Sequence, residues 1–186
     1  MTIYKNKGFS LVEMMVVVSI FLIITAVVLF NAPRFRQQAS IDLIANEVAV
    51  LINEAKTYGI GALVETVEDP APVYAVVFDN TSVNNTKIKI YSFENESEID
   101  LTSLSGSLVT YNLDGGVSVN NLTYNSNNQG AGDNLAVIFK RDGYGQAQFK
   151  CADTCSSVSY VSIELVNNEG DKKTIEVWNN GQIAVK

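Results

Sequence analysis

Two groups of residues in this sequence could take part in chemistry, and they lie far apart in the chain. The first is Gly8-Phe9 together with Glu13, in an otherwise apolar N-terminal run. A cut between Gly8 and Phe9 would free an α-amino group four residues before the Glu13 carboxylate. Such an amine and carboxylate could form an ion pair, since residues four apart are neighbours on a helix. The second group is the cysteine pair Cys151 and Cys155.

The residues around Glu13 predict a helix long enough to cross a membrane. Residues 9–32 contain a single charged side chain, that of Glu13. A helix of this length spans roughly 36 Å, and the hydrocarbon core of a bilayer is about 30 Å thick. A carboxylate in such a segment costs roughly 2.5–3.5 kcal/mol on insertion scales, so Glu13 requires a cation within the membrane.

Three kinds of N-terminal segment are compatible with such a helix. A cleaved signal peptide has its small-residue cut site after the apolar region, whereas Gly8 precedes it and no Ala-x-Ala occurs before Pro33. A plain signal anchor explains the apolar run and the flanking Lys5 and Lys7, but it gives Glu13 no role. A cut after Gly8 supplies Glu13 with a cation.

The stretch Gly8-Phe9-Ser10-Leu11-Val12-Glu13 resembles the processing site of type IV pilins and type II secretion pseudopilins. In that family a short basic leader ends in glycine, a phenylalanine becomes the mature N-terminus, and a glutamate stands at the fifth mature position. The resemblance implies cleavage after Gly8 by a prepilin peptidase, N-methylation of Phe9, and contact of Glu13 with the N-terminal amine of a neighbouring subunit.

The resemblance also implies a place in the cell. The chain would wait in the cytoplasmic membrane as a single-pass protein with an extracytoplasmic C-terminal domain. It would then join other pilin or pseudopilin subunits in a periplasmic or cell-surface filament. Lys5 and Lys7 before the apolar run are balanced in number by Arg34 and Arg36 after it, so the distribution of positive charge alone does not fix the orientation.

We expect four segments along the chain: a leader at 1–8, a transmembrane and assembly helix at 9–32, an amphipathic continuation at 33–62, and a β-rich globular domain at 63–186. Pro33 is expected to kink the helix, or alternatively to mark its exit from the bilayer. Gly59 and Gly61 are expected to end the helix. Apolar residues at three- and four-residue spacing predict a core-facing stripe: Ile41, Ile44, Val48, Leu51, Ile52, Ala55 and Tyr58.

The C-terminal part reads as short β-strands separated by turns. Strands are predicted at 73–78, 87–93, 107–113, 117–124, 135–140, 146–150, 158–166, 173–178 and 182–185. Hairpin turns are predicted at Asp114-Gly115-Gly116, Asp142-Gly143, Glu169-Gly170-Asp171 and Asn179-Asn180-Gly181. Asn-rich stretches at 80–86 and 120–132 are expected to form exposed loops. A sheet of antiparallel strands on one long helix is an α+β fold, as in pilins.

Composition limits the chemistry of this domain. The sequence contains no histidine, which excludes Ser-His-Asp and Cys-His catalytic arrangements. Two cysteines without histidine cannot complete a zinc site, so Cys151 and Cys155 are expected to form a disulfide that closes a small local loop. The alternating acids Glu94, Glu96 and Glu98 are expected to be solvated. We expect no metal, no cofactor and no enzymatic activity.

A weaker resemblance covers parts of the second half. Residues 51–61, the stretch Ala136-Val137-Ile138-Phe139-Lys140-Arg141-Asp142-Gly143, and residues 173–185 resemble the H-type pseudopilin and FimT-like minor pilin group. The helix end lacks the arginine often seen in that group. Membership implies a minor filament component.

FimT-like relatives suggest an alternative function, the capture of DNA for uptake. Residues 41–186 hold nine Lys or Arg and 19 Asp or Glu, a formal charge of −10, and this disfavours a nucleic-acid surface. The available basic clusters are Lys140-Arg141 with Lys150, and Lys172-Lys173 with Lys186.

Overall fold

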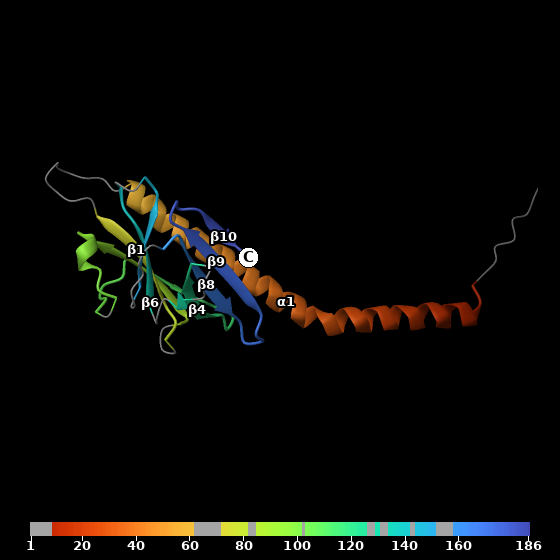
Figure 1. The fold of residues 1–186 in the computed structure, drawn as a ribbon. Helices are drawn as coiled ribbons and strands as arrows, with labels where there is room; N and C mark the ends of the chain where they lie inside the picture. Colours follow the sequence, from red (N-terminus) through yellow and green to blue (C-terminus); the bar gives the residue numbers. More distant parts are fainter. Residues whose placement is uncertain are drawn as a thin grey trace, which may run out of the picture. The chain divides into compact units, whose positions relative to one another are not determined.

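The computed structural model describes residues 9–61, 72–81, 85–101, 103–125, 129–130, 134–141, 144–151 and 158–186, with the backbone alone at 31–37 and 129–130. The chain divides into two compact units, Met1–Ala39 and Ser40–Lys186. In the described part, one α-helix is followed by ten β-strands and a short 3₁₀ helix at Glu96–Glu98. The α+β class predicted from the sequence is confirmed (Figure 1).

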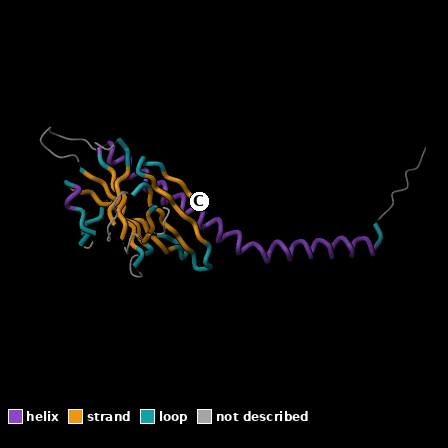
Figure 2. Tube along the Cα trace, viewed as in Figure 1, coloured by secondary structure: helices purple, strands orange, loops and turns teal. Residues whose placement is uncertain are grey.

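The single helix α1 runs from Leu11 to Gly61, which confirms one long helix through the N-terminal third of the chain (Figure 2). Within the first unit, Leu11–Phe30 is long and apolar enough to cross a membrane, and none of it is buried. The backbone stays helical through Pro33. The kink expected at this proline therefore remains a prediction.

Two antiparallel sheets, not one, make up the rest of the second unit. Sheet A has the order β3 (Val109–Asn112), β2 (Lys87–Phe93), β1 (Val73–Asp79), β6 (Asn134–Phe139) and β7 (Ala147–Cys151). Sheet B has the order β10 (Ile183–Val185), β9 (Lys172–Trp178), β8 (Tyr160–Val166), β4 (Ser118–Tyr124) and β5 (Gln129–Gly130). The nine predicted strands are all present, with ends that differ by at most two residues. The prediction of a single sheet is wrong.

One core joins both sheets to the second half of α1. Its helical residues are fully or almost fully buried: Ile41, Ile44, Ala45, Val48, Leu51, Ile52 and Ala55. They pack with inward-facing residues of both sheets, such as Phe78 and Phe139 of sheet A and Ile163 of sheet B. Figure 1 shows the labelled strands gathered around this part of the helix.

Tyr58 was predicted to belong to this stripe, and that prediction is wrong. Its side chain is exposed, its hydroxyl donates a hydrogen bond to Glu54, and its ring packs against that of Tyr74 with centroids 5.6 Å apart. Four-residue spacing brings Tyr58 beside Glu54 on the helix surface, and the hydroxyl then keeps its end of the ring in contact with polar groups.

Sheet A is covered on both faces, whereas sheet B is covered on one. A second cluster on the outer face of sheet A includes Val77, Tyr91 and Ile138, and it packs under Ile99 and Leu101. Strands β1 and β6 are therefore apolar almost throughout. Strand β8 alternates between buried and half-buried residues, as expected for a sheet with one solvated face.

The turn predictions are confirmed in two places. Glu169-Gly170-Asp171 joins the paired strands β8 and β9, and Asn179-Asn180-Gly181 joins β9 and β10. Asp142-Gly143 lies outside the described residues, between the paired strands β6 and β7.

The hairpin predicted at Asp114-Gly115-Gly116 is wrong, because this turn leads from β3 in sheet A to β4 in sheet B. Gly115 and Gly116 have φ values of +67° and +74°. This left-handed conformation is the property that made the stretch look like a hairpin turn.

The loop predicted at 120–132 is wrong in part, because residues 120–124 belong to β4 and Gln129–Gly130 forms β5. Inward-facing Leu122 is buried and anchors this Asn-rich segment to the core.

Gly59 does not end the helix as predicted, whereas Gly61 is its last residue. A Cβ atom at position 59 would lie 2.8 Å from the Cβ of Phe139 and 2.9 Å from its carbonyl carbon and oxygen. The absence of a side chain thus allows α1 to approach the backbone of β6 closely. A Cβ at Gly61 would meet nothing within 4 Å.

Candidate functional site

The start of α1 is a capping box formed by Ser10 and Glu13. The backbone N–H of Glu13 donates to the Ser10 hydroxyl at 3.2 Å, and the backbone N–H of Ser10 donates to the Glu13 carboxylate at 3.4 Å. The first helical backbone bond runs from Met14 N–H to the Ser10 carbonyl. Ser10 is therefore the N-cap, and Glu13 is the third helical residue that closes the box.

This arrangement gives Glu13 a role within its own chain. The carboxylate accepts from a backbone N–H that the helix would otherwise leave without a partner. A negative charge in the first turn is also favoured by the helix dipole. The cost of placing Glu13 in an apolar helix is thus partly offset before any other subunit is present.

Ser10 is not among the site residues predicted from the sequence. The signal was present, because Ser10-Leu11-Val12-Glu13 has the spacing of a capping box directly before an apolar run. The structure also corrects the geometry around Phe9. Helix α1 begins at Leu11, so Phe9 precedes the cap and is not stacked one helical turn from Glu13 in this chain. Gly8 lies outside the described residues.

The other polar groups of the apolar segment are satisfied along the helix itself. The Ser19 hydroxyl donates to the Met15 carbonyl at 2.7 Å, and the Thr25 hydroxyl donates to the Phe21 carbonyl at 2.8 Å. Both hydroxyls thus bond to the backbone of the preceding helical turn. Glu13 is thus the one ionisable side chain in Leu11–Phe30, and every large apolar side chain around it faces outward.

A family model described as the prokaryotic N-terminal methylation motif matches residues 3–29. The chain carries the signature of type IV pilins and pseudopilins. No curated protein and no solved structure shows significant similarity to it. The motif covers the capping box and most of the apolar helix, and it implies a precursor that is processed by prepilin peptidase and assembles with other pilins. Together with the helix it indicates anchoring in a membrane through the N-terminus.

In the second unit, the outward face of α1 in this pilin-like chain carries a shallow apolar groove of about 450 Å³. Leu43 and Val50, one on each side of Glu47, are 60% and 65% exposed. The Tyr111 hydroxyl of β3 donates a hydrogen bond to the Glu47 carboxylate. Burial and this carboxylate raise the pKa of Tyr111 to about 12.

The raised pKa of Tyr111 predicts a loss of stability at alkaline pH. The phenol of an unfolded chain titrates near pH 10, so its neutral form is favoured in the folded unit. The stabilisation is complete below about pH 10 and is lost as the pH rises through about 12. We expect Tyr111→Phe to reduce this pH dependence in urea unfolding experiments. Tyr144→Phe is the control, since its side chain is 94% exposed. Equal pH slopes for the two variants would contradict the assignment.

Only one of the two cysteines of the predicted disulfide lies among the described residues. Cys151 is the last residue of β7, and Cys155 lies outside the described residues. The Cys151–Cys155 bond therefore remains a prediction.

Most basic residues in the two clusters considered for nucleic-acid binding contact acidic side chains or backbone carbonyls. Ion pairs join Lys140 to Glu96, Lys172 to Glu164, Lys173 to Asp42 and Lys186 to Glu176, over 2.8–3.0 Å. Lys150 donates to the carbonyl of Ile99. All three lysines of the cluster Lys172, Lys173 and Lys186 thus face acids, whereas Lys140 alone does so in the other cluster.

Proposed function

We propose that this chain is a structural subunit, a minor pilin or pseudopilin, of a type IV pilus-like or type II secretion filament. The observation that carries the proposal is the start of α1: a single capped carboxylate leads an apolar helix with no buried residue. A helix that is apolar on all sides needs lipid or other helices around it. None of Leu11–Phe30 is buried, so this segment lacks such a cover in the single chain.

The proposed mechanism has two stages. In the membrane, lipid surrounds Leu11–Phe30, and Ser10 partly satisfies Glu13. After cleavage behind Gly8, the apolar helices of several subunits leave the lipid and pack together. Glu13 then exchanges its weak 3.4 Å bond for the α-ammonium group of a neighbour's Phe9. An uncompensated carboxylate in an apolar bundle would cost several kcal/mol, so this pairing favours one axial register between neighbours.

The DNA-capture alternative finds no support in the described surface. A nucleic-acid site needs clustered free cations, and the lysines of both candidate clusters lie in ion pairs or hydrogen bonds. The filament role needs no ligand for the second unit.

A minor component would be scarce in filaments sheared from cells.

Leader cleavage can be tested at Gly8. We expect Gly8→Leu to stop processing, because the peptidase must accommodate a side chain where the chain has none. The precursor would then accumulate at full mass in cells that contain a prepilin peptidase, as read by mass spectrometry. Lys5→Gln is the control in the same leader and should be processed normally. Processing of Gly8→Leu at the wild-type rate would place the cut elsewhere.

A further inference from the structure

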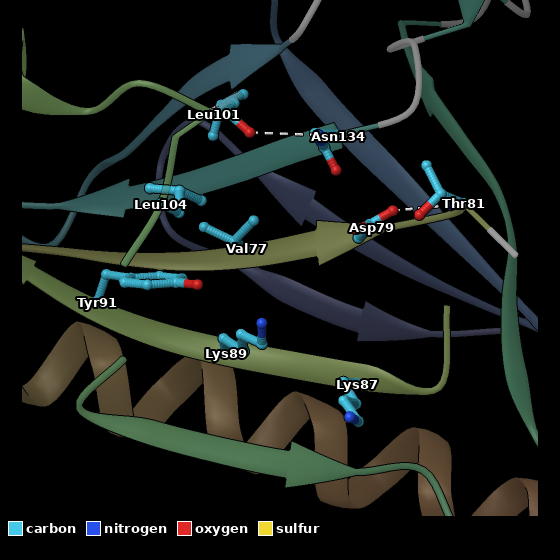
Figure 3. A pocket seen from close by; sticks show the side chains of 9 residues that line it. All are labelled: Val77, Asp79, Thr81, Lys87, Lys89, Tyr91, Leu101, Leu104 and Asn134. Carbon is cyan, nitrogen blue, oxygen red and sulfur yellow. Dashed lines mark hydrogen bonds between the residues drawn. The ribbon is translucent and has the colours of Figure 1, made fainter. Parts of the chain in front are cut away.

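The outer face of sheet A contains a cavity of about 450 Å³ that the filament role does not use (Figure 3). It is built on β1, β2 and β6, and Leu101 and Leu104 also line it. It opens on the side of sheet A opposite to the core shared with α1, where Val77 and Tyr91 belong to the outer cluster.

The register of the strands explains why this place is hollow. Val77 of β1 lies between Lys89 of β2 and Ala136 of β6. The side chain of Ala136 is a single methyl group, so little side-chain volume fills the space beside Val77. Leu101 and Leu104 bridge the hollow from above, and the Asn134 side-chain amide donates to the Leu101 carbonyl at 3.3 Å. Val77, Leu101 and Leu104 thus form the apolar part of its lining, and Leu101 is held through its carbonyl.

Two lysines line this cavity, and neither forms an ion pair or a hydrogen bond with another described residue. Nine Lys and Arg residues lie in the second unit, and six of them form ion pairs or hydrogen bonds: Lys56, Lys140, Lys150, Lys172, Lys173 and Lys186. Within the described part of the chain, Lys87, Lys89 and Arg141 form none, and the two lysines line this cavity. Figure 3 shows the Lys89 ammonium group turned into the hollow.

The cavity also presents one anion and one neutral donor. Asp79 accepts the backbone N–H of Thr81 through Oδ1 at 2.7 Å and forms no ion pair with either lysine. Tyr91 is 4% exposed, and burial together with the Asp79 carboxylate raises its pKa, so its hydroxyl remains a donor. The Lys89 ammonium group and the Tyr91 hydroxyl thus line the same cavity as the Asp79 carboxylate.

We propose that this cavity binds a small organic acid with a hydroxyl or ammonium donor near its carboxylate, as in sugar acids and amino acids. The carboxylate accepts from the Lys89 ammonium group and the Tyr91 hydroxyl, in charge-assisted hydrogen bonds. The donor group of the ligand faces Asp79, and its carbon skeleton lies on Val77 under Leu104. This inference goes beyond the filament role and does not depend on it.

Other ligand classes fit these residues less well. A phosphate dianion would be repelled by Asp79 and would leave the apolar floor uncovered. A metal ion would find one carboxylate beside two ammonium groups, and the described residues contain no cluster of three potential metal ligands. A purely apolar ligand would bury unpaired lysines at a large cost.

The test uses the full chain in neutral detergent and isothermal titration calorimetry at low salt. Sodium galacturonate and L-leucine represent the two sources of the acid. Galactose and L-leucinamide are their matched controls without a carboxylate, and inorganic phosphate is the control for a simple anion. We expect at least one acid to bind, at least ~10-fold more tightly than its control and than phosphate.

Variants then place the site. Lys89→Gln should weaken binding of that acid at least ~10-fold. Lys186→Gln removes the same charge from an ion pair on sheet B and should bind as the wild type does. If only one of the two acids binds, the result shows whether the ligand is a sugar acid or an amino acid. The proposal is overturned if neither acid binds, if phosphate binds as tightly, or if the two lysine variants bind equally well.

Discussion

Glu13→Gln is expected to abolish incorporation of the chain into filaments while leaving its helix capped and inserted in the membrane. Glutamine can occupy the same position of a capping box, so the bond from Ser10 N–H is retained. Only the negative charge is lost. The α-ammonium group of a neighbouring Phe9 would then be buried without a counter-charge, which costs about 3–5 kcal/mol. Incorporation should fall by at least ~100-fold.

Two matched variants separate the roles of charge and cap at this site. Glu13→Ala loses both and should fail to assemble as Glu13→Gln does. Ser10→Ala loses the hydroxyl that accepts from Glu13 N–H but keeps the carboxylate, so it should cost only about 1 kcal/mol of helix stability and still assemble. Immunoblots of sheared filaments measure the assembled chain, and immunoblots of membranes measure the unassembled chain. If Glu13→Gln assembles and Glu13→Ala does not, the carboxylate acts as a cap and not as an ion pair.

The second large effect is expected at Gly59, inside α1. Gly59→Leu would force the side chain against the Cβ and the backbone carbonyl of Phe139, both within 2.9 Å of the new Cβ. Strand β6 lies between β1 and β7 in sheet A, so it cannot move without disturbing two ladders. We expect a loss of at least ~3 kcal/mol, which corresponds to roughly 10 °C in Tm for a unit of this size.

Gly61→Leu is the matched control for this prediction. It introduces the same side chain in the same helix, at a position where a Cβ meets nothing within 4 Å. Leucine has a higher helix propensity than glycine, so this variant should be as stable as the wild type or slightly more stable. Circular dichroism during heating measures both variants. Equal Tm values would show that α1 and β6 can separate at little cost.

The sequence predicted the local structure well, because that structure depends on patterns within a few residues. The three- and four-residue spacing of Ile41, Ile44, Val48 and Ile52 is sufficient to define the buried face of α1. Ser10 was also predictable, since its spacing from Glu13 is that of a capping box. The motif at residues 3–29 rests on the same local stretch.

Features that depend on distant residues were not predictable in the same way. The turn at Asp114-Gly115-Gly116 has the residues of a hairpin, and only the packing of two sheets around the buried face of α1 decides that its strands enter different sheets. Gly59 resembles a helix terminator until Phe139 is placed beside it. The outer cavity joins Asp79 and Lys89 with Leu101 and Leu104, and no sequence spacing relates these groups.

The most direct test of the filament account is the mass of the N-terminal peptide of the wild-type chain isolated from its native host. The account predicts a peptide that begins at Phe9 and carries one methyl group on its α-amine. A peptide that begins at Met1, or one that begins after the apolar helix, would contradict it, because Glu13 would then have no amine of a neighbouring subunit to pair with.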